Sequence, residues 1–253
     1  MTNPTITTLM AHRSIRHFTS EKLTTAEVDT LVTAAQHAAT STFSQQVSII
    51  SVTDPAKLAI LGEITGHHWL EQAGHYFLFV ADQARNARLA GDSTTAQANL
   101  HSTDKLLAGI FDATIAIEAI VTAGESLGLG STIMGSVLND VPRLIETFDL
   151  PSLTFPVLGL AIGHPAEQPE QKPRLPQELM HFNNAYKPLT ATEPQLAAYD
   201  RAITSYYQQR GSHQRKETYT HHILTEFSRD PKQRAGITAA LKQQGFLTDV
   251  PTQ

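Results

Sequence analysis

The stretch Phe155-Pro156-Val157-Leu158-Gly159-Leu160-Ala161-Ile162 is an unbroken apolar run, and Gly163-His164-Pro165 closes it. Short apolar runs bounded by turn residues are typical of strands buried on both faces. The run therefore predicts a central strand over residues 155–162.

Three further segments are expected to join this strand in a sheet. Residues 47–52 are mostly β-branched and end before Asp54-Pro55, residues 76–80 are aromatic and apolar, and residues 131–134 form a shorter segment. β-Branched and aromatic side chains favour strands. Helical patterns separate these segments, so the sequence predicts the α+β fold class.

Helices are expected between and after the strands. Thr24 and Glu27 have the spacing of a capping box, in which each side chain bonds a free amide of the first turn. Asn139 or Asp140 can cap another helix, with Pro142 in its tolerated first turn. The apolar spacing predicts further helices over residues 56–64, about 94–127, 194–210, 217–228 and 231–244.

Prolines mark a change of character after residue 164. Pro165, Pro169, Pro173 and Pro176 fall close together and predict a surface loop or linker of restricted shape. We therefore divide the chain into a core domain, residues 1–164, and a proline-rich loop with a helical C-terminal extension, residues 165–253. We expect both to belong to one structural unit.

The composition excludes several classes of function. Hydrophobic residues make up 41% and charged residues 17%, against about 25% charged in an average domain, so the chain is not disordered. The formal charge of -5 disfavours a dedicated nucleic-acid binder. The absence of cysteine removes disulfides, thiolate nucleophiles and cysteine-based metal sites.

Export and membrane insertion are not expected. Residues 1–10 are polar and lack the pattern of a secretory signal. The most apolar region, residues 106–123, is interrupted by Asp112 and Glu118, and no stretch approaches the roughly 20 apolar residues that span a bilayer. We expect a soluble, cytoplasmic protein.

Two familiar signals lack the context that they need. Gly124-Glu125-Ser126-Leu127-Gly128 has the form of a hydrolase nucleophile elbow, but a predicted helix enters it where a strand is required. The pairs His67-His68 and His221-His222 place adjacent side chains about 100° apart on a helix, so neither pair chelates a metal. We expect no metal.

Two basic segments remain as candidate anion sites. His12-Arg13-Ser14-Ile15-Arg16 offers an imidazole, a hydroxyl and two forked guanidiniums, which suit a phosphate. In Lys172-Pro173-Arg174, proline restricts the backbone between two cations, which lowers the entropy lost on binding an anion. By spacing alone, a solvated surface pair explains each segment equally well.

Five motifs in order resemble one family. They are His-Arg-Ser-Ile-Arg-His-Phe at 12–18, Thr-Ser-Thr-Phe-Ser-Gln at 40–45, Glu-Ser-Leu-Gly-Leu-Gly at 125–130, Lys-Pro-Arg-Leu-Pro at 172–176 and Tyr-Tyr-Gln-Gln-Arg-Gly-Ser at 206–212. Together they resemble the flavin-dependent nitroreductase superfamily, in its oxygen-insensitive NADPH nitroreductase and NADPH–FMN oxidoreductase branch. The resemblance implies an FMN enzyme, an intertwined homodimer with a mixed sheet flanked by helices, and two active sites at the subunit interface.

The resemblance also implies a role for individual residues. FMN would be held by His12, Arg13, Ser14, Arg16, Lys172 and Arg174 at its phosphate and ribityl chain, by Ser41, Thr42, Phe43 and Gln45 from the partner subunit, and by His68, Ile133, Met134, Gly135 and Ser136 around its ring. NADPH would be held by Asn139, Arg210 and Arg215. The cofactor carries the difficult chemistry in such enzymes, so no protein nucleophile or general acid is required.

The sequence departs from the family's pattern at the flavin pocket. His68 replaces a glutamine, Ser131 and Ser136 replace glycines, and Ile133 and Met134 replace a tyrosine–isoleucine type of pair. These changes leave the choice of electron acceptor open. The expected activity is NADPH-dependent reduction of nitroaromatics, quinones or free flavin. The alternatives are a dedicated flavin reductase that supplies reduced FMN and a non-catalytic flavin-binding protein.

Overall fold

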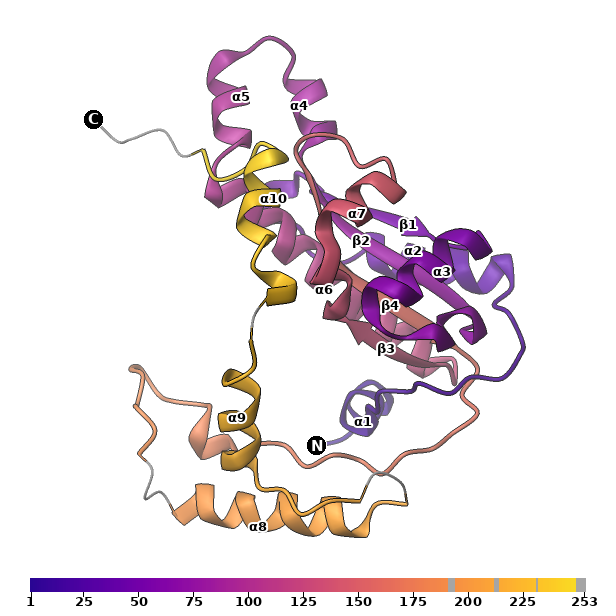
Figure 1. Ribbon diagram of the computed structural model, residues 1–253, viewed down its shortest axis with the longest axis vertical. Helices are drawn as coiled ribbons and strands as arrows, with labels where there is room; N and C mark the ends of the chain where they lie inside the picture. Colours follow the sequence, from indigo (N-terminus) through magenta and orange to yellow (C-terminus); the bar gives the residue numbers. More distant parts are fainter. Residues whose placement is uncertain (191–193, 212–213, 231, 249–253) are drawn as a thin grey trace. The chain divides into compact units, whose positions relative to one another are not determined.

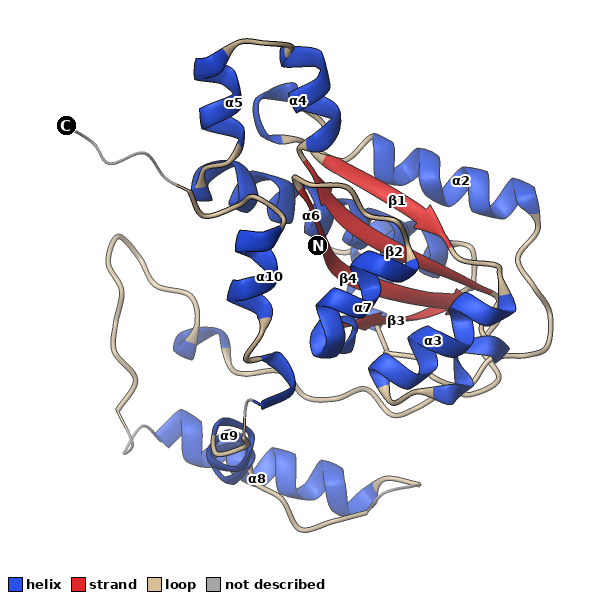
Figure 2. Cartoon of the chain, turned by 45° about the horizontal axis from the view of Figure 1, so that its top comes forward, coloured by secondary structure: helices blue, strands red, loops and turns tan. Residues whose placement is uncertain are grey.

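Four strands form one sheet, and each neighbouring pair runs antiparallel (Figures 1 and 2). The strands are β1 (Val47–Ser51), β2 (His75–Asp82), β3 (Gly130–Met134) and β4 (Thr154–Gly163), in the order β1-β2-β4-β3. β4 has a neighbour on each side and is buried almost throughout, which confirms the predicted central strand. The computed structural model describes the chain except residues 191–193, 212–213, 231 and 249–253.

The α+β class is confirmed, but the expectation of a mixed sheet is wrong for these four strands. Within the described parts of the chain, parallel pairing amounts to an isolated bridge between Ser14 and Ser131. The ladder of β2 and β4 shifts its register beside Pro156, where Phe79 pairs with Leu158 but Val80 pairs with Pro156. Proline has no amide hydrogen to donate to a ladder, so it is tolerated at such an irregularity.

Helices cover both faces of the sheet (Figure 2). One layer holds α2 (Thr25–Gln36) and α6 (Thr103–Ser126), and the other holds α3 (Pro55–Thr65), η3 (Gly135–Asp140) and α7 (Val141–Thr147). Successive side chains of a strand point to opposite faces. Accordingly Phe77 and Phe79 of β2 pack with α2 and α6, whereas Tyr76 and Leu78 pack with α3 and α7.

The prediction of a single helix over residues 94–127 is wrong. The segment is divided into α5 (Thr94–Leu100) and α6, because the Ser102 side chain accepts a hydrogen bond from the Lys105 amide and begins a new helix. α4 (Ala84–Ala90) was not predicted. The capping box of Thr24 and Glu27 at the start of α2 is confirmed, and a short α1 (Pro4–Ala11) precedes it.

α6 has one buried and one exposed side. By length and composition it could cross a membrane, but half of its most apolar window is buried, as in the core helix of a soluble protein. Its exposed side carries Leu107, Phe111 and Ile115. Residues four apart lie on one face of a helix, so these three side chains form an apolar stripe.

The chain forms two compact units, which we describe separately. The first contains Met1–Pro169 and the chain from Lys232 onward, and the second contains Glu170–Pro231. In the second unit lie η4 (Gln177–Leu179), α8 (Pro194–Gln209) and α9 (Tyr219–Phe227).

The chain returns to the first unit through η5 (Lys232–Arg234) and α10 (Ile237–Gln243). There the buried Gln244 donates from Nε2 to the carbonyls of Pro151 and Thr154. The chain from Lys232 onward thus belongs to the first unit, whereas we expected residues 165–253 to form one extension. The first residue of the helix predicted over 231–244 lies outside the described range.

Candidate functional site

The first basic segment, residues 12–16, is fixed beside the start of β3. The Ile15 amide donates to the Ser131 carbonyl at 2.8 Å. A side chain on Gly130 would place its Cβ 2.5 Å from Ile15 Cγ1, so only glycine permits this approach. Ile15 is therefore anchored in the core, while its polar neighbours lie toward the surface.

Arg13 contributes a buried donor that has no acceptor. Its Nε is buried without a hydrogen-bond partner among the described residues, although Nη1 donates to the Ala11 carbonyl at 2.9 Å. Arg13 lines a cavity of about 750 Å3 together with Glu125 and Gly128. An unsatisfied buried donor is costly, and a bound anion would supply its missing acceptor.

Two carboxylates that were not predicted share this cavity. Glu125 lies 2.6 Å from His12 Nδ1, which leaves Nε2 of that ring for a ligand. Glu167 accepts hydrogen bonds from the amides of Arg16 and His17 at 2.8 and 3.1 Å. Glu125 belongs to the third quoted motif and could have been recognised, whereas nothing in the sequence indicates the contact of Glu167.

The segment 41–46 is a tight loop held from below by α6. Asp112, which is 2% exposed, accepts the amides of Ser41 at 2.8 Å and Gln46 at 2.9 Å on its two oxygens. Between these anchors, Thr42, Phe43 and Gln45 have φ of 52°, 58° and 48°, a region that side chains disfavour. The outcome is a fixed loop with Phe43 84% exposed at its tip.

α4 holds the far side of the same loop. Arg85 Nη2 donates to the carbonyls of Gln45 and Val47, and Asn86 Nδ2 donates to the carbonyl of Ser44 at 3.3 Å. Arg85 and Asn86 were not predicted, because the helix that carries them, α4, was not predicted. Asp112 interrupts an apolar stretch of the sequence, and this interruption is the signal that could have identified it.

The residues expected around the flavin ring lie on different faces. Ile133 is exposed on β3, whereas Met134 points the other way and is buried. Gly135 and Ser136 begin η3, and His68 is exposed at the start of η2 (His68–Gln72).

Arg234, which was also not predicted, fixes the turn that η3 makes. It donates to the Gly135 carbonyl at 3.0 Å and to Asn139 Oδ1 at 3.2 Å. Asn139 in turn donates to the Ile64 carbonyl at 3.2 Å, so its side chain is held from both sides.

The second unit brings three cations to one aromatic ring. Lys172 Nζ lies 5.6 Å from the centroid of Tyr207, Arg210 Cζ lies 5.9 Å from it, and Arg215 Cζ lies 3.9 Å from it. Arg174 is held nearby, donating to the Lys172 carbonyl at 2.7 Å. Lys172 is expected at the phosphate of FMN and the two arginines at NADPH, whereas all three lie around Tyr207.

Two carboxylates border this cluster, and one of them, Glu217, forms an ion pair with Arg215. Glu170 accepts the Gly211 amide at 3.1 Å, and backbone hydrogen bonds at Glu170 and Gly211 lower its pKa. Glu217 lies 2.6 Å from His221 Nδ1 and 3.4 Å from Arg215 Nε, and the hydrogen bond with His221 is the main cause of its lowered pKa.

Positive charge therefore remains at the cluster. Within the described ranges, neither Lys172 nor Arg210 has a carboxylate within ion-pair distance, and the buried Nε of Arg210 has no hydrogen-bond partner. Such a group of cations is suited to bind an anion.

Comparison with known proteins shows which family the chain belongs to. The nitroreductase family matches residues 9–164, and the C-terminal domain of the same family matches residues 172–249. Over 247 residues the chain is 38% identical to the oxygen-insensitive NADPH nitroreductase of Salmonella typhimurium, with 97% of this chain and 99% of that protein covered. It is 36% identical over 247 residues to the FMN reductase (NADPH) of Bacillus subtilis, with 96% and 98% covered.

A solved structure gives the same relationship. The NfrA1 nitroreductase from B. subtilis superimposes with a TM-score of 0.89 at 36% identity, covering 96% of this chain and 98% of that one. The resemblance seen in the five motifs is thereby confirmed, and the relatives are NADPH nitroreductase and FMN reductase oxidoreductases. On these grounds the chain is an oxidoreductase that belongs to the nitroreductase family.

Proposed function

We propose that the protein is an FMN-dependent NADPH oxidoreductase that reduces nitroaromatics, quinones or free flavin. The observation that carries the proposal is that each unit holds an arginine, Arg13 or Arg210, whose buried Nε has no acceptor among the residues that the structure describes. Both lie near further cations in a chain of net negative charge, and the fork of a guanidinium matches the geometry of a phosphate.

The residues present fit FMN. His12, Arg13, Ser14 and Arg16 would hold the phosphate and ribityl chain, with Lys172 and Arg174 supplying further charge. The cavity beside Arg13 measures about 750 Å3, within the range of roughly 300–1,000 Å3 that cofactor pockets occupy. When bound, FMN supplies ping-pong hydride transfer through its N5 atom.

The residues of η3 would orient the ring rather than react with it. Gly135 and Ser136 offer backbone groups at a turn that Arg234 fixes. His68, Ile133 and Met134 would complete the surroundings of the ring. NADPH would bind at Arg210 and Arg215, with Asn139 as a further contact.

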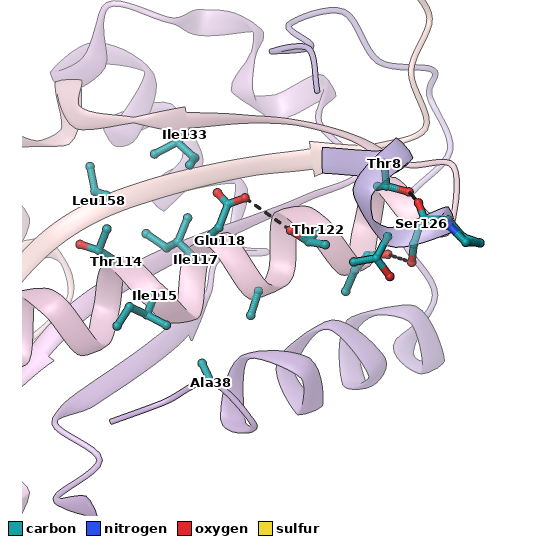
Figure 3. A pocket seen from close by; sticks show the side chains of 14 residues that line it. Thr8, Ala38, Thr114, Ile115, Ile117, Glu118, Thr122, Ser126, Ile133 and Leu158 are labelled. Carbon is teal, nitrogen blue, oxygen red and sulfur yellow. Dashed lines mark hydrogen bonds between the residues drawn. The ribbon is translucent and has the colours of Figure 1, made fainter. Parts of the chain in front are cut away.

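We also propose that the protein works as a homodimer, in the cytoplasm. The apolar stripe of α6 continues into a cavity of about 900 Å3, which Ile115, Ile133 and Leu158 line together (Figure 3). Exposed apolar surfaces of this kind mark interfaces. The fixed loop 41–46, with its exposed Phe43, would bring Ser41, Thr42, Phe43 and Gln45 to the partner's flavin.

The relatives favour a second candidate within the same chemistry. One is named a nitroreductase and another an FMN reductase. Free FMN and nitroaromatics are therefore equal candidates for the substrate. A dedicated flavin reductase would release reduced FMN, whereas a nitroreductase would keep it bound. A non-catalytic flavin-binding protein would have no use for the cation cluster around Tyr207.

Anaerobic reduction tests the proposal directly. We expect the purified protein to be a yellow dimer with about one FMN per chain, and NADPH without air to bleach it. Steady-state rates with nitrofurazone, a benzoquinone and free FMN then rank the acceptors. A flavin that NADPH leaves oxidised would contradict the proposed activity, and a flavin-loaded monomer in sedimentation would contradict the proposed dimer.

Arg174→Ala is expected to weaken FMN binding. Losing a charge-assisted hydrogen bond costs about 1.5–3 kcal/mol, or roughly one to two decades in dissociation constant. Fluorescence titration of apoprotein with FMN measures the change, with Arg201→Ala on the exposed side of α8 as control. An unchanged dissociation constant would make Lys172 and Arg174 a surface pair.

Arg210→Ala is expected to raise the KM for NADPH and to leave NADH kinetics and FMN content unchanged. The two nucleotides differ in the 2′-phosphate, whose charge the cluster would bind. The loss should shrink in high salt, because the screening length falls from about 10 Å at 0.1 M to about 3 Å at 1 M. Equal losses with NADPH and NADH would assign Arg210 to the fold or to the flavin.

A further inference from the structure

Tyr207 lies where the cations of the second unit meet. It belongs to the last turns of α8, and its side chain is 4% exposed in a cluster with Tyr199, Ile203 and Leu175. The neighbouring Tyr206 is 5.5 Å from Arg210 Cζ, so Arg210 lies near two rings. Tyr207 lies in the fifth motif, at residues 206–212, but the motif does not indicate that this ring is the common centre of the three cations.

Arg215 is held at this ring by three contacts. Its guanidinium carbon lies 3.9 Å from the ring centroid, its Nε lies 3.4 Å from Glu217, and its amide donates to the Tyr207 carbonyl at 3.3 Å. The backbone contact ties the segment after α8 to the helix end. The ring contact then fixes where the guanidinium at the end of that segment lies.

Because like charges repel, the cluster of Lys172, Arg210 and Arg215 needs an attractive interaction that holds the cations together. The face of an aromatic ring carries negative potential and attracts cations within about 6 Å. The carbonyl end of α8 adds partial negative charge that also favours cations. The ring carries no full negative charge, so Lys172 and Arg210 keep their charge available to a ligand, whereas Arg215 also pairs with Glu217.

We infer that Tyr207 is a positioning residue that sets the preference for a 2′-phosphorylated nucleotide. Its ring holds Arg210 and Arg215 together as a preformed receptor for the 2′-phosphate. Preformed groups lose less entropy on binding than mobile ones. The inference rests on the proposed function, because it presupposes that the cluster receives NADPH.

Substitutions separate the ring face from the hydroxyl and from packing. Tyr207→Phe keeps the ring, whereas Tyr207→Leu removes it and leaves an apolar side chain. Tyr199→Leu is the matched control, since Tyr199 packs in the same cluster and its hydroxyl donates to the Pro173 carbonyl at 3.1 Å. Phenylalanines of increasing fluorination at position 207 weaken the negative potential of the ring face with little change in volume. They test the role of the ring even if the leucine variant fails to fold.

Two measurements on the FMN-loaded protein read out the effect. The first is the ratio of kcat/KM for NADPH to that for NADH. The second, independent of catalysis, is the calorimetric affinity for adenosine 2′,5′-bisphosphate relative to adenosine 5′-monophosphate. We expect Tyr207→Leu to lower both ratios about fivefold, fluorination to lower them stepwise, and Tyr207→Phe and Tyr199→Leu to leave them unchanged.

The outcomes distinguish this inference from the proposed function. A wild-type protein that does not discriminate between the two adenosine nucleotides would overturn the proposed NADPH site. A second outcome is that Arg210→Ala lowers the preference for the 2′-phosphorylated nucleotide, whereas Tyr207→Leu and fluorination leave it unchanged. This outcome would overturn only the role of Tyr207. If Tyr207→Phe lowers the two ratios as much as Tyr207→Leu does, the hydroxyl and not the ring is responsible, and the inference is overturned.

Discussion

Ile115→Asp is expected to yield a folded monomer that holds no FMN. Ile115 is 45% exposed in the described chain and lies in the stripe of α6 that we propose to be covered by a second subunit. Burying an unpaired carboxylate costs several kcal/mol. A two-fold interface carries each substitution twice, so we expect association to weaken by at least about a hundredfold, or roughly 3 kcal/mol.

Sedimentation velocity and the absorbance of bound flavin measure this result. Ile115→Val is the matched control, because it removes one methylene and adds no charge, and it should remain a flavin-loaded dimer. Circular dichroism must show the wild-type helix content in the aspartate variant, since the change lies on the outer side of α6. A flavin-loaded dimer in Ile115→Asp would place the interface on another surface.

The sheet could be predicted because each strand is marked locally. The run at residues 155–162 is apolar throughout, as expected of a strand in a sheet whose two faces are both covered. The division of residues 94–127 into two helices could not be predicted from periodicity. A single serine side chain at Ser102 decides it, and serine occurs in helix interiors as well as at caps.

The candidate site could be predicted only in pieces. His12, Arg13 and Lys172 are recognisable because each lies in a short basic segment, and Arg210 is recognisable because it lies in a motif that resembles the family's. That Lys172 and Arg210 share the ring of Tyr207 depends on how the chain folds back between them, and no local pattern carries that information. Arg234 and Glu167 were missed for the same reason, because each acts on a segment far away in sequence.

Asp112→Asn is expected to destabilise the protein and to release the loop 41–46. The carboxylate accepts one amide on each oxygen. Asparagine has a single acceptor oxygen, so either the Ser41 or the Gln46 amide would face an amino group inside the core. Leaving a buried donor unsatisfied costs about 1–3 kcal/mol, which corresponds to a fall in Tm of roughly 2–12 °C for a chain of this size.

The loop should respond more than the fold, because its backbone is already strained. Non-glycine residues in the left-handed region cost about 1 kcal/mol or more each, and Thr42, Phe43 and Gln45 all lie there. The two hydrogen bonds to Asp112 offset part of this cost. Without one of them, we expect the amides of residues 41–46 to exchange hydrogen faster than those of β2, which is anchored in the sheet.

Asp104→Asn on the same helix is the matched control, because that side chain is 79% exposed and pairs with the neighbouring Lys105. An exposed ion pair contributes about 0.2–1 kcal/mol, so its Tm should stay close to that of the wild type. Equal falls in Tm for Asp104→Asn and Asp112→Asn would show that the loss of an acid from α6, and not the anchoring of the loop, is responsible. If Asp112→Asn lowers Tm and leaves exchange in residues 41–46 unchanged, Arg85 and Asn86 of α4 are sufficient to hold the loop.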